Sequence, residues 1–337
     1  MNSRVSSALS LQNFARVLPV ITTLRDNRPD QLVRILWKSA GIPVLAIAMF
    51  LLGWSQISSN IVTSLGTIPG PVAVYEEAQI LWADHVEQRA KATAFFERQE
   101  ARNARKLAKN PDAVVKIRAY TGKPTYIDQI ITSLKTVFMG FLLATLLAVP
   151  LGILCGLSNT ANAAFSPMIH IFKPVSPLAW LPIVTMLVSA LYVSDDPFFA
   201  KSFLTSAITV TLCSLWPTLI NTALGVASID KELLNVSRVL QLNWVTKVRK
   251  LVLPSSLPLI FTGMRLSLGV GWMVLIAAEM LAQNPGLGKF VWDEFQNGSS
   301  HSLARIVVAI FTIGFIGFLL DRLMLILQRA VTFDENR

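Results

Sequence analysis

Long apolar runs are the feature of this sequence that most restricts its fold. They occur at about residues 40–57, 133–157, 165–192, 203–226, 257–281 and 306–327. Runs of roughly 18 or more apolar residues are typical of helices that cross a lipid bilayer. Charged residues make up only 15% of the chain, against about 25% in soluble globular proteins. The sequence therefore predicts an all-α integral membrane protein with about six transmembrane helices.

The distribution of basic residues predicts on which side of the membrane the two ends of the chain lie. Residues 1–39 form a polar, basic lead before the first run, without the cleavage pattern of a signal peptide. Basic residues favour the cytoplasmic side, so we expect the lead in the cytoplasm. Six crossings return the tail, residues 330–337, to the same side. The formal net charge of +10 then indicates contact with anionic lipid headgroups and not with nucleic acid.

The hydrophilic stretch at residues 58–127 follows the first predicted helix, residues 40–57. We expect it on the outer side, as a helical insertion before a five-helix core at residues 128–329. A long helix rich in Ala, Glu, Arg and Lys is predicted over Val74–Lys109. Its basic character does not oppose this placement, because the charge rule weakens for loops longer than about 60 residues. Two interpretations stay open for the helix: a solvated surface element, or a docking surface for a binding protein.

The third apolar run contains three prolines, in the segment PVSPLAWLPI. Proline removes a backbone hydrogen bond, so the helix is expected to break there, as helices that line a pathway often do. Ser194-Asp195-Asp196-Pro197 predicts an outer turn after it. Candidate pathway residues on the third, fourth and fifth runs are Ser176, Trp180, Thr211, Ser214 and Trp272. The alternative is that the hydroxyls only satisfy local carbonyl groups or join helices.

Charges inside apolar runs are costly and are functional candidates by default. Two stand out in the fifth run, Arg265 and Glu279. We take Glu279 as the acid in the span cores and expect it to pair with Lys135 at the same depth. The three histidines are scattered, and both cysteines lie within apolar runs. This pattern predicts no catalytic residues, no metal site and no cofactor.

A short basic stretch, LLNVSRVLQLNWVTKVRKLVLP, separates the fourth and fifth runs within the predicted inner loop at residues 229–254. It resembles the cytoplasmic coupling loop of ATP-driven importer permeases, whose motif reads E-A-A, three residues, Gly, nine residues, Ile, one residue, Leu-Pro. The matching positions here are Asn235, Val236 and Ser237, followed by Arg238, then Gln241 at the glycine, and Leu251, Leu253 and Pro254 at the close. The spacing is kept, while Asn235 replaces the motif Glu and Gln241 replaces the motif Gly.

The resemblance implies a type I ABC importer permease. Its partners would be cytoplasmic ATP-binding subunits, a periplasmic or lipid-anchored substrate-binding protein and a second copy of the chain. The glycine of the motif permits positive φ, so Gln241 is expected either to strain that turn or to adopt a different one. The loop's basic residues would either pair with acids on the ATPase or hold the loop at the lipid surface. No phosphate-binding G-x-x-x-x-G-K-[ST] motif occurs, so the ATPase must be a separate chain.

The resemblance extends from about Thr132 to Arg329, through the segments SLKTVFMGFLLATLLAVPLGILCGLS, PVSPLAWLPI, LVLPSSLPLIFTGMRLSLGVGWMVLIAAEM and NPGLG. These look like permeases for nitrate, sulfonate, taurine and bicarbonate, and most like nitrate permeases. The resemblance thus implies import of nitrate, or nitrite, across a bacterial inner membrane, by a subunit that is not itself an enzyme. Taurine, alkanesulfonates or bicarbonate are alternative cargoes. Secondary transporters and intramembrane enzymes are more remote, because neither an internal repeat nor a catalytic spacing is evident.

Overall fold

A computed structural model describes residues 34, 37–63, 66–110, 114–115, 117–193, 198–299 and 301–331. Most of the predicted cytoplasmic lead, the predicted turn at Ser194–Pro197 and almost all of the predicted tail lie outside these ranges. The chain divides into two compact units, residues 1–73 and 74–337.

The first unit holds one apolar helix. A short π-helix, η1 (Trp37–Gly41), leads into α3 (Ile42–Asn60), and a small antiparallel hairpin of β1 (Val62–Thr63) and β2 (Gly66–Thr67) follows. Most large apolar side chains of α3 are exposed within the chain, as expected of a helix surrounded by lipid. Its apolar part, Ile42–Ser58, is shorter than the four helical stretches of the second unit that are long enough to cross a membrane. The first predicted span therefore corresponds to a short helix.

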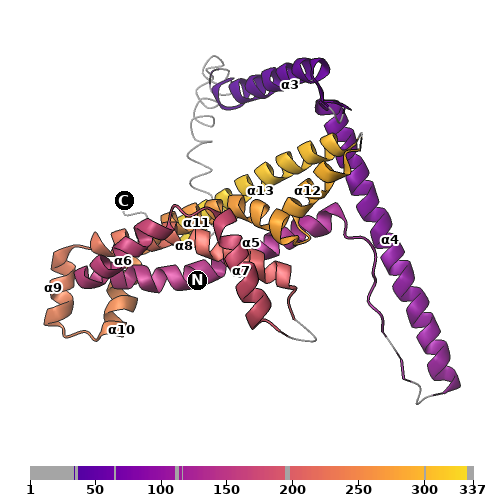
Figure 1. The fold of residues 1–337 in the computed structure, drawn as a ribbon. Coiled ribbons are helices and arrows are strands. Elements are labelled where there is room, and N and C mark those ends of the chain that lie inside the picture. The colour runs from indigo at the N-terminus through magenta and orange to yellow at the C-terminus, as the bar shows by residue number, and fades with distance from the viewer. Residues whose placement is uncertain are drawn as a thin grey trace, which may run out of the picture. The chain divides into compact units, whose positions relative to one another are not determined.

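Within its described residues, the second unit has helices as its only regular elements (Figure 1). Its elements are α4 (Pro71–Lys109, whose first three residues belong to the first unit), α5 (Tyr126–Leu157), α6 (Asn159–Phe172), α7 (Pro177–Leu191), α8 (Lys201–Ala227), α9 (Lys231–Val239), α10 (Trp244–Lys247), η2 (Val248–Val252), α11 (Leu253–Ala282), α12 (Leu287–Asn297) and α13 (Ser302–Val331).

The number of spans depends on the third predicted run. Among the described residues, four helical stretches are long and apolar enough to cross a membrane: Tyr126–Leu157, Lys201–Ala227, Trp244–Ala282 and Ser302–Val331. The third run is instead broken into α6 and α7, which meet at 102° and give a fifth span if counted together. The predicted break at the prolines is confirmed, since α7 begins at Pro177. The sequence did not predict so sharp a bend.

Helix α8 forms the centre of the second unit, packed against α5 on one side and α11 on the other. Small residues recur at every fourth position of α5 where it meets α8: Gly140, Ala144, Ala148, Gly152 and Gly156. A Cβ atom at Gly152 would lie 2.6 Å from Thr222 Cβ. On the other side, a Cβ atom at Gly263 of α11 would lie 2.9 Å from the Pro217 carbonyl oxygen. Small residues let membrane helices approach to backbone contact, so these positions fix how the three helices pack.

The three central helices give the second unit two distinct ends. At the loop end, Ile153, Val226, Ile229 and Val252 form a buried cluster where α5 and α8 finish and α11 begins. At the opposite end, Tyr126 at the start of α5 packs against Phe290 of α12, with ring centroids 4.8 Å apart. Helices α9 and α10 therefore belong to the loop end, and α12 belongs to the opposite end.

Candidate functional site

The predicted coupling loop is a helix–turn–helix at the loop end. Asp230 caps α9 by accepting from the Glu232 amide at 2.9 Å, and Asn243 caps α10 by accepting from the Thr246 amide at 2.8 Å. Between them, the Leu242 amide donates to the Ser237 carbonyl at 3.1 Å, and the Gln241 amide donates to the Arg238 carbonyl at 3.0 Å. This pair of bonds defines a Schellman motif, whose C′ residue is left-handed and usually glycine.

Gln241 occupies that left-handed position, with φ of 45°. The motif glycine stands at this same point, so the kept spacing correctly located the turn although the residue differs. A non-glycine residue in this conformation costs roughly 1 kcal/mol or more. The turn thus forms at a modest cost in strain, without a change of geometry.

One face of the loop packs inward and the other is exposed. Ser237 is buried and donates to the Leu234 carbonyl at 2.7 Å, while Leu234 packs against the buried cluster of the loop end. Asn235 and Arg238 are exposed and bonded to each other at 3.3 Å. Five further apolar side chains are more than half exposed, and we call them the exposed loop patch: Val236, Val239, Leu240, Trp244 and Val245. Exposed apolar side chains gathered on one short segment are typical of a docking surface.

The close of the motif joins the loop to the membrane helix. Val252 is fully buried, Leu253 begins α11, and Pro254, which has no N–H to donate to the preceding turn, lies in the first turn of α11. The chain continues from α10 through the π-helix η2 into α11 without a break in helical structure. The loop is therefore continuous with a helix of the core.

The two candidates on the third run lie together at its break. Ser176 caps α7 by accepting from the Leu178 amide at 3.3 Å. Trp180 packs against Phe172 of α6 across the bend, with ring centroids 5.7 Å apart. Its indole N–H is buried and has no hydrogen-bond partner among the described residues. Because buried polar groups are nearly always bonded, this donor is available to a partner outside the described residues.

The two candidates on the fourth run lie between helices of the same chain. Thr211 Oγ1 donates to the carbonyls of Ala207 at 2.8 Å and Gly140 at 3.1 Å. Ser214 is fully buried beside Gly271 of α11. The bonds of Thr211 favour the alternative interpretation, in which a hydroxyl group joins α8 to its neighbour. The buried Ser214 hydroxyl has no hydrogen-bond partner among the described residues.

The candidate on the fifth run lines a cavity of about 210 Å³ between α11 and α13. Trp272 donates from its indole nitrogen to the Ile313 carbonyl at 3.0 Å. Further along the cavity, Arg265 of α11 donates to both carboxylate oxygens of Asp321 of α13, at 2.5 and 2.9 Å. The Arg265 and Asp321 side chains are 38% and 39% exposed.

Asp321 was missed by the sequence analysis, which took Glu279 as the acid in the span cores. The sequence does contain a signal for this pair. Asp321 is an acid inside the last apolar run, and it could have been matched to Arg265 in the preceding run. A bidentate arginine–carboxylate ion pair is strong and directional. In the interior of a membrane protein it marks a position that is structural or functional and not incidental.

The predicted pairing of Glu279 with Lys135 is wrong. Glu279 is fully buried near the end of α11, whereas Lys135 is exposed. The Glu279 carboxylate accepts instead from Ser133 Oγ of α5 at 2.7 Å and from the Gly288 amide at 3.1 Å. It also lies 3.4 Å from the Asn284 side-chain nitrogen. A Cβ atom at Gly286 would collide with this carboxylate, so the NPGLG segment wraps closely around Glu279. The residue joins α5, α11 and α12 at the opposite end.

Comparison with known proteins decides the family. The family described as "Binding-protein-dependent transport system inner membrane component" matches residues 148–333, which include the loop and the cavity. This chain belongs to that family. It is a permease subunit of an ABC importer and lies in the inner membrane.

Curated relatives include permeases for two different anions. The permease is 35% identical over 209 residues to "Nitrate import permease protein NrtB" of Leptolyngbya laminosa, covering 62% of this chain and 70% of that one. It is 36% identical over 204 residues to "Bicarbonate transport system permease protein CmpB" of Synechococcus elongatus, covering 60% and 68%. Among solved structures, an inward-facing MetNI methionine ABC transporter superposes with a TM-score of 0.49 at 16% identity, covering 62% of this permease and 96% of that chain.

The strain at Gln241 gives a testable prediction for the permease. Gln241→Gly removes the left-handed penalty and should stabilise the end of α9 by about 1 kcal/mol. Gln241→Val should have the opposite effect, because a branched side chain tolerates this conformation least. The readout is hydrogen exchange at the Leu242 amide, which should slow about fivefold in the glycine variant if local opening governs it. Gln283→Gly relieves a similar conformation at the end of α11 (φ of 56°) and serves as the control. Equal exchange rates at the Leu242 amide in all variants would contradict the assignment of strain to Gln241.

Proposed function

We propose that this permease carries a small monovalent oxyanion into the cell, with nitrate, or nitrite, as the first candidate. The similarity to nitrate permeases supports this cargo, and the similarity to bicarbonate permeases makes bicarbonate the second candidate. Both candidates are planar monovalent oxyanions, so one site chemistry suits either. Taurine and alkanesulfonates differ in shape and rank lower.

The coupling loop is the observation that carries the proposal. It combines a Schellman turn at the motif position with an exposed apolar patch. In the proposed mechanism this patch docks into a groove of a cytoplasmic ATP-binding subunit, which places the loop end and both termini in the cytoplasm. Movement of the ATPase would be transmitted through the buried cluster to α5, α8 and α11 together, because packed helices move as near-rigid bodies.

The pathway is proposed to run along the α11–α13 face, next to a second copy of the permease. An ion pair that is more than a third exposed would be costly if it faced lipid, so charges in membranes face protein or water. Arg265 uses two donor nitrogens for Asp321, which leaves further N–H groups for a passing anion. Trp272 shares the same cavity, and the unbonded indole of Trp180 supplies a separate donor at the break of the third run.

The docking step can be tested at the most exposed position of the loop patch. Val239 is 81% exposed, so Val239→Asp should leave the fold intact but place a charge in the docking surface. Val193, which is 78% exposed just after α7, gives a matched control, Val193→Asp. We expect the Val239 variant to weaken copurification of the ATP-binding subunit and to lower uptake about tenfold or more. Normal uptake in the Val239 variant would contradict the proposal that the loop patch docks the ATP-binding subunit.

The pathway assignment needs variants that separate transport from packing. Arg265→Gln leaves Asp321 without its partner, so a loss of uptake alone would be ambiguous. The double variant Arg265→Met with Asp321→Leu removes both charges, and well-packed apolar replacements of ion pairs are often tolerated. We expect the double variant to assemble with its ATPase normally but to lose most anion uptake. Full uptake by the double variant would assign the pair a purely structural role.

A further inference from the structure

The long helix α4 has strongly segregated charge. Its first part, residues 71–88, carries four acids, Glu76, Glu77, Asp84 and Glu87, and no lysine or arginine. Its second part, residues 89–109, carries seven basic residues against two acids, a net charge of +5. Most of the acids lie near the start and the basic side chains near the end. The two parts of the helix therefore present opposite charges.

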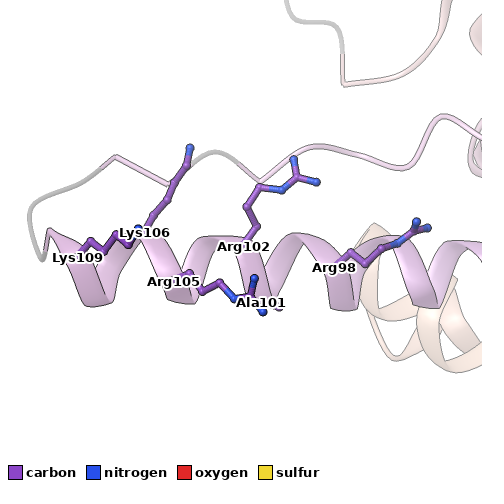
Figure 2. Close-up of a pocket in the computed structure, with 6 residues that line it drawn as sticks. All are labelled: Arg98, Ala101, Arg102, Arg105, Lys106 and Lys109. Carbon is purple, nitrogen blue, oxygen red and sulfur yellow. The ribbon is translucent and has the colours of Figure 1, made fainter.

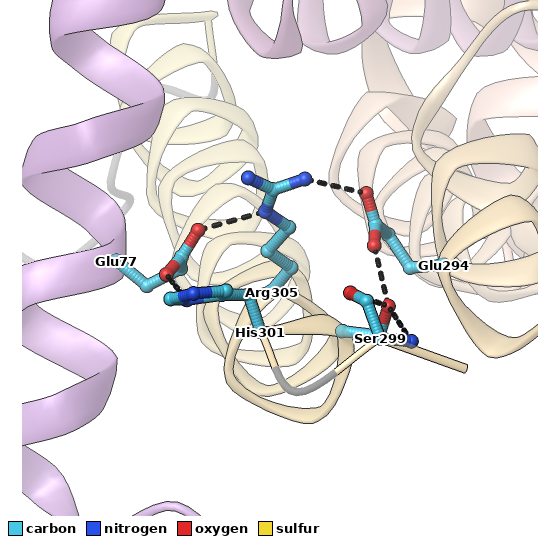
Figure 3. Close-up of polar contacts among 6 residues, drawn as sticks. Glu77, Glu294, Ser299, His301 and Arg305 are labelled. Carbon is cyan, nitrogen blue, oxygen red and sulfur yellow. Dashed lines mark hydrogen bonds and ion pairs between the residues drawn. The ribbon is translucent and has the colours of Figure 1, made fainter. Parts of the chain in front are cut away.

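The acidic part is anchored to the end of the core opposite the loop. Glu77 is buried and accepts from Arg305 Nε of α13 at 2.7 Å, and its other oxygen lies 3.0 Å from His301 Nδ1. Arg305 also donates to Glu294 of α12 at 3.2 Å (Figure 3). Two turns along α4, His85 Nδ1 lies 2.7 Å from Thr125 Oγ1, beside the start of α5. The base of α4 is thus fixed by specific polar contacts on the side away from the proposed ATPase.

The basic part carries a row of exposed cations. Arg98, Arg102, Arg105, Lys106 and Lys109 follow the spacing i, i+4, i+7, i+8 and i+11 along the end of α4 (Figure 2). We call these five residues the basic arm. They surround Ala101 and border an open hollow of about 450 Å³. No carboxylate of the described part of the chain lies within ion-pair distance of them; Arg98 donates only to the Ala94 carbonyl of its own helix.

The composition of the arm indicates the class of its partner. A helix that lies in a membrane surface needs an apolar face opposite its basic one. Between Arg98 and Lys109, Leu107 is the single large apolar residue, so the arm lacks such a face. Exposed cations on a helix suit the acidic surface of a protein, where they speed encounter and set orientation while adding little to affinity. This is the behaviour required of a partner that must dock and leave in each cycle.

We propose that the basic arm docks an acidic face of the solute-binding protein that delivers the anion to this permease. The inference rests on the proposed function, since it names the outer partner of the same importer. The arm also precedes the matched region, residues 148–333, so the contact belongs to the insertion of this chain and not to the shared core.

The test compares two variants with equal helix-forming tendency. In the first, Arg102, Arg105, Lys106 and Lys109 are all replaced by Gln, which removes four charges but favours helix nearly as well. In the matched control, Arg102→Lys, Arg105→Lys, Lys106→Arg and Lys109→Arg keep every charge. Each permease is assembled with its ATP-binding subunits in phosphatidylcholine nanodiscs, and the dissociation constant of the purified, anion-loaded solute-binding protein is measured.

We expect the neutral variant to bind about tenfold more weakly than wild type at about 50 mM salt, and the difference to vanish near 500 mM salt, where charges are screened. The control should match wild type under both conditions. Equal affinity of wild type and the neutral variant at low salt would overturn the inference. So would an effect that appears only with about 30% phosphatidylglycerol in the disc, which would assign the arm to lipid, or a change in the number of permease copies per disc.

Failure of the proposed function would look different. In that case the wild-type permease would not copurify with ATP-binding subunits, and basal ATP hydrolysis would be absent in every variant. Basal hydrolysis retained in all variants, together with unaltered docking in the neutral one, would leave the importer assignment standing and remove only the role of the arm.

Discussion

The close approach of α5, α8 and α11 is the constraint on which the rest of this permease depends. Lipid tails are as apolar as the side chains, so the hydrophobic effect does not drive helices together within a membrane. Helices associate there through tight packing and hydrogen bonds. Glycines at positions 152 and 263 bring the backbones of α5 and α11 against α8 from two sides. Hydroxyl groups then cross the resulting contacts, as Thr218 Oγ1 does to Ser267 Oγ at 2.7 Å. Helices held this closely move together and not independently.

Both ends of this three-helix core carry the elements that give it a function. At the loop end, a buried apolar cluster attaches α9 and η2, which continues α10, to all three helices. At the opposite end, the carboxylate of Glu279 is enclosed by Ser133, Asn284 and the amide of Gly288. A displacement of the loop would therefore reach the far side of the membrane through one packed body. This arrangement suits the proposed mechanism, in which the permease transmits the movement of an ATP-binding subunit.

The sequence was a good guide where local chemistry decides the outcome and a poor one where tertiary contacts do. Apolar runs located the apolar helices, proline located the break at Pro177, and motif spacing located the left-handed turn at Gln241. The pairing of Glu279 with Lys135 failed because opposite charge at equal depth says nothing about which way each side chain points. Backbone and hydroxyl donors satisfied the acid instead. The contact between Arg265 and Asp321 joins residues 56 positions apart, and only the packing of α11 on α13 brings them together.

Anion uptake by the complete importer tests the central claim most directly. Proteoliposomes would contain this permease with its ATP-binding subunits, receive the solute-binding protein from outside, and be given labelled nitrate with excess bicarbonate or taurine as competitor. The account predicts uptake that requires ATP and both partner proteins, and that taurine does not reduce. Competition by bicarbonate would change the cargo but keep the mechanism. Nitrate uptake that persists without the ATP-binding subunits would contradict the account, because the loop would then have nothing to couple.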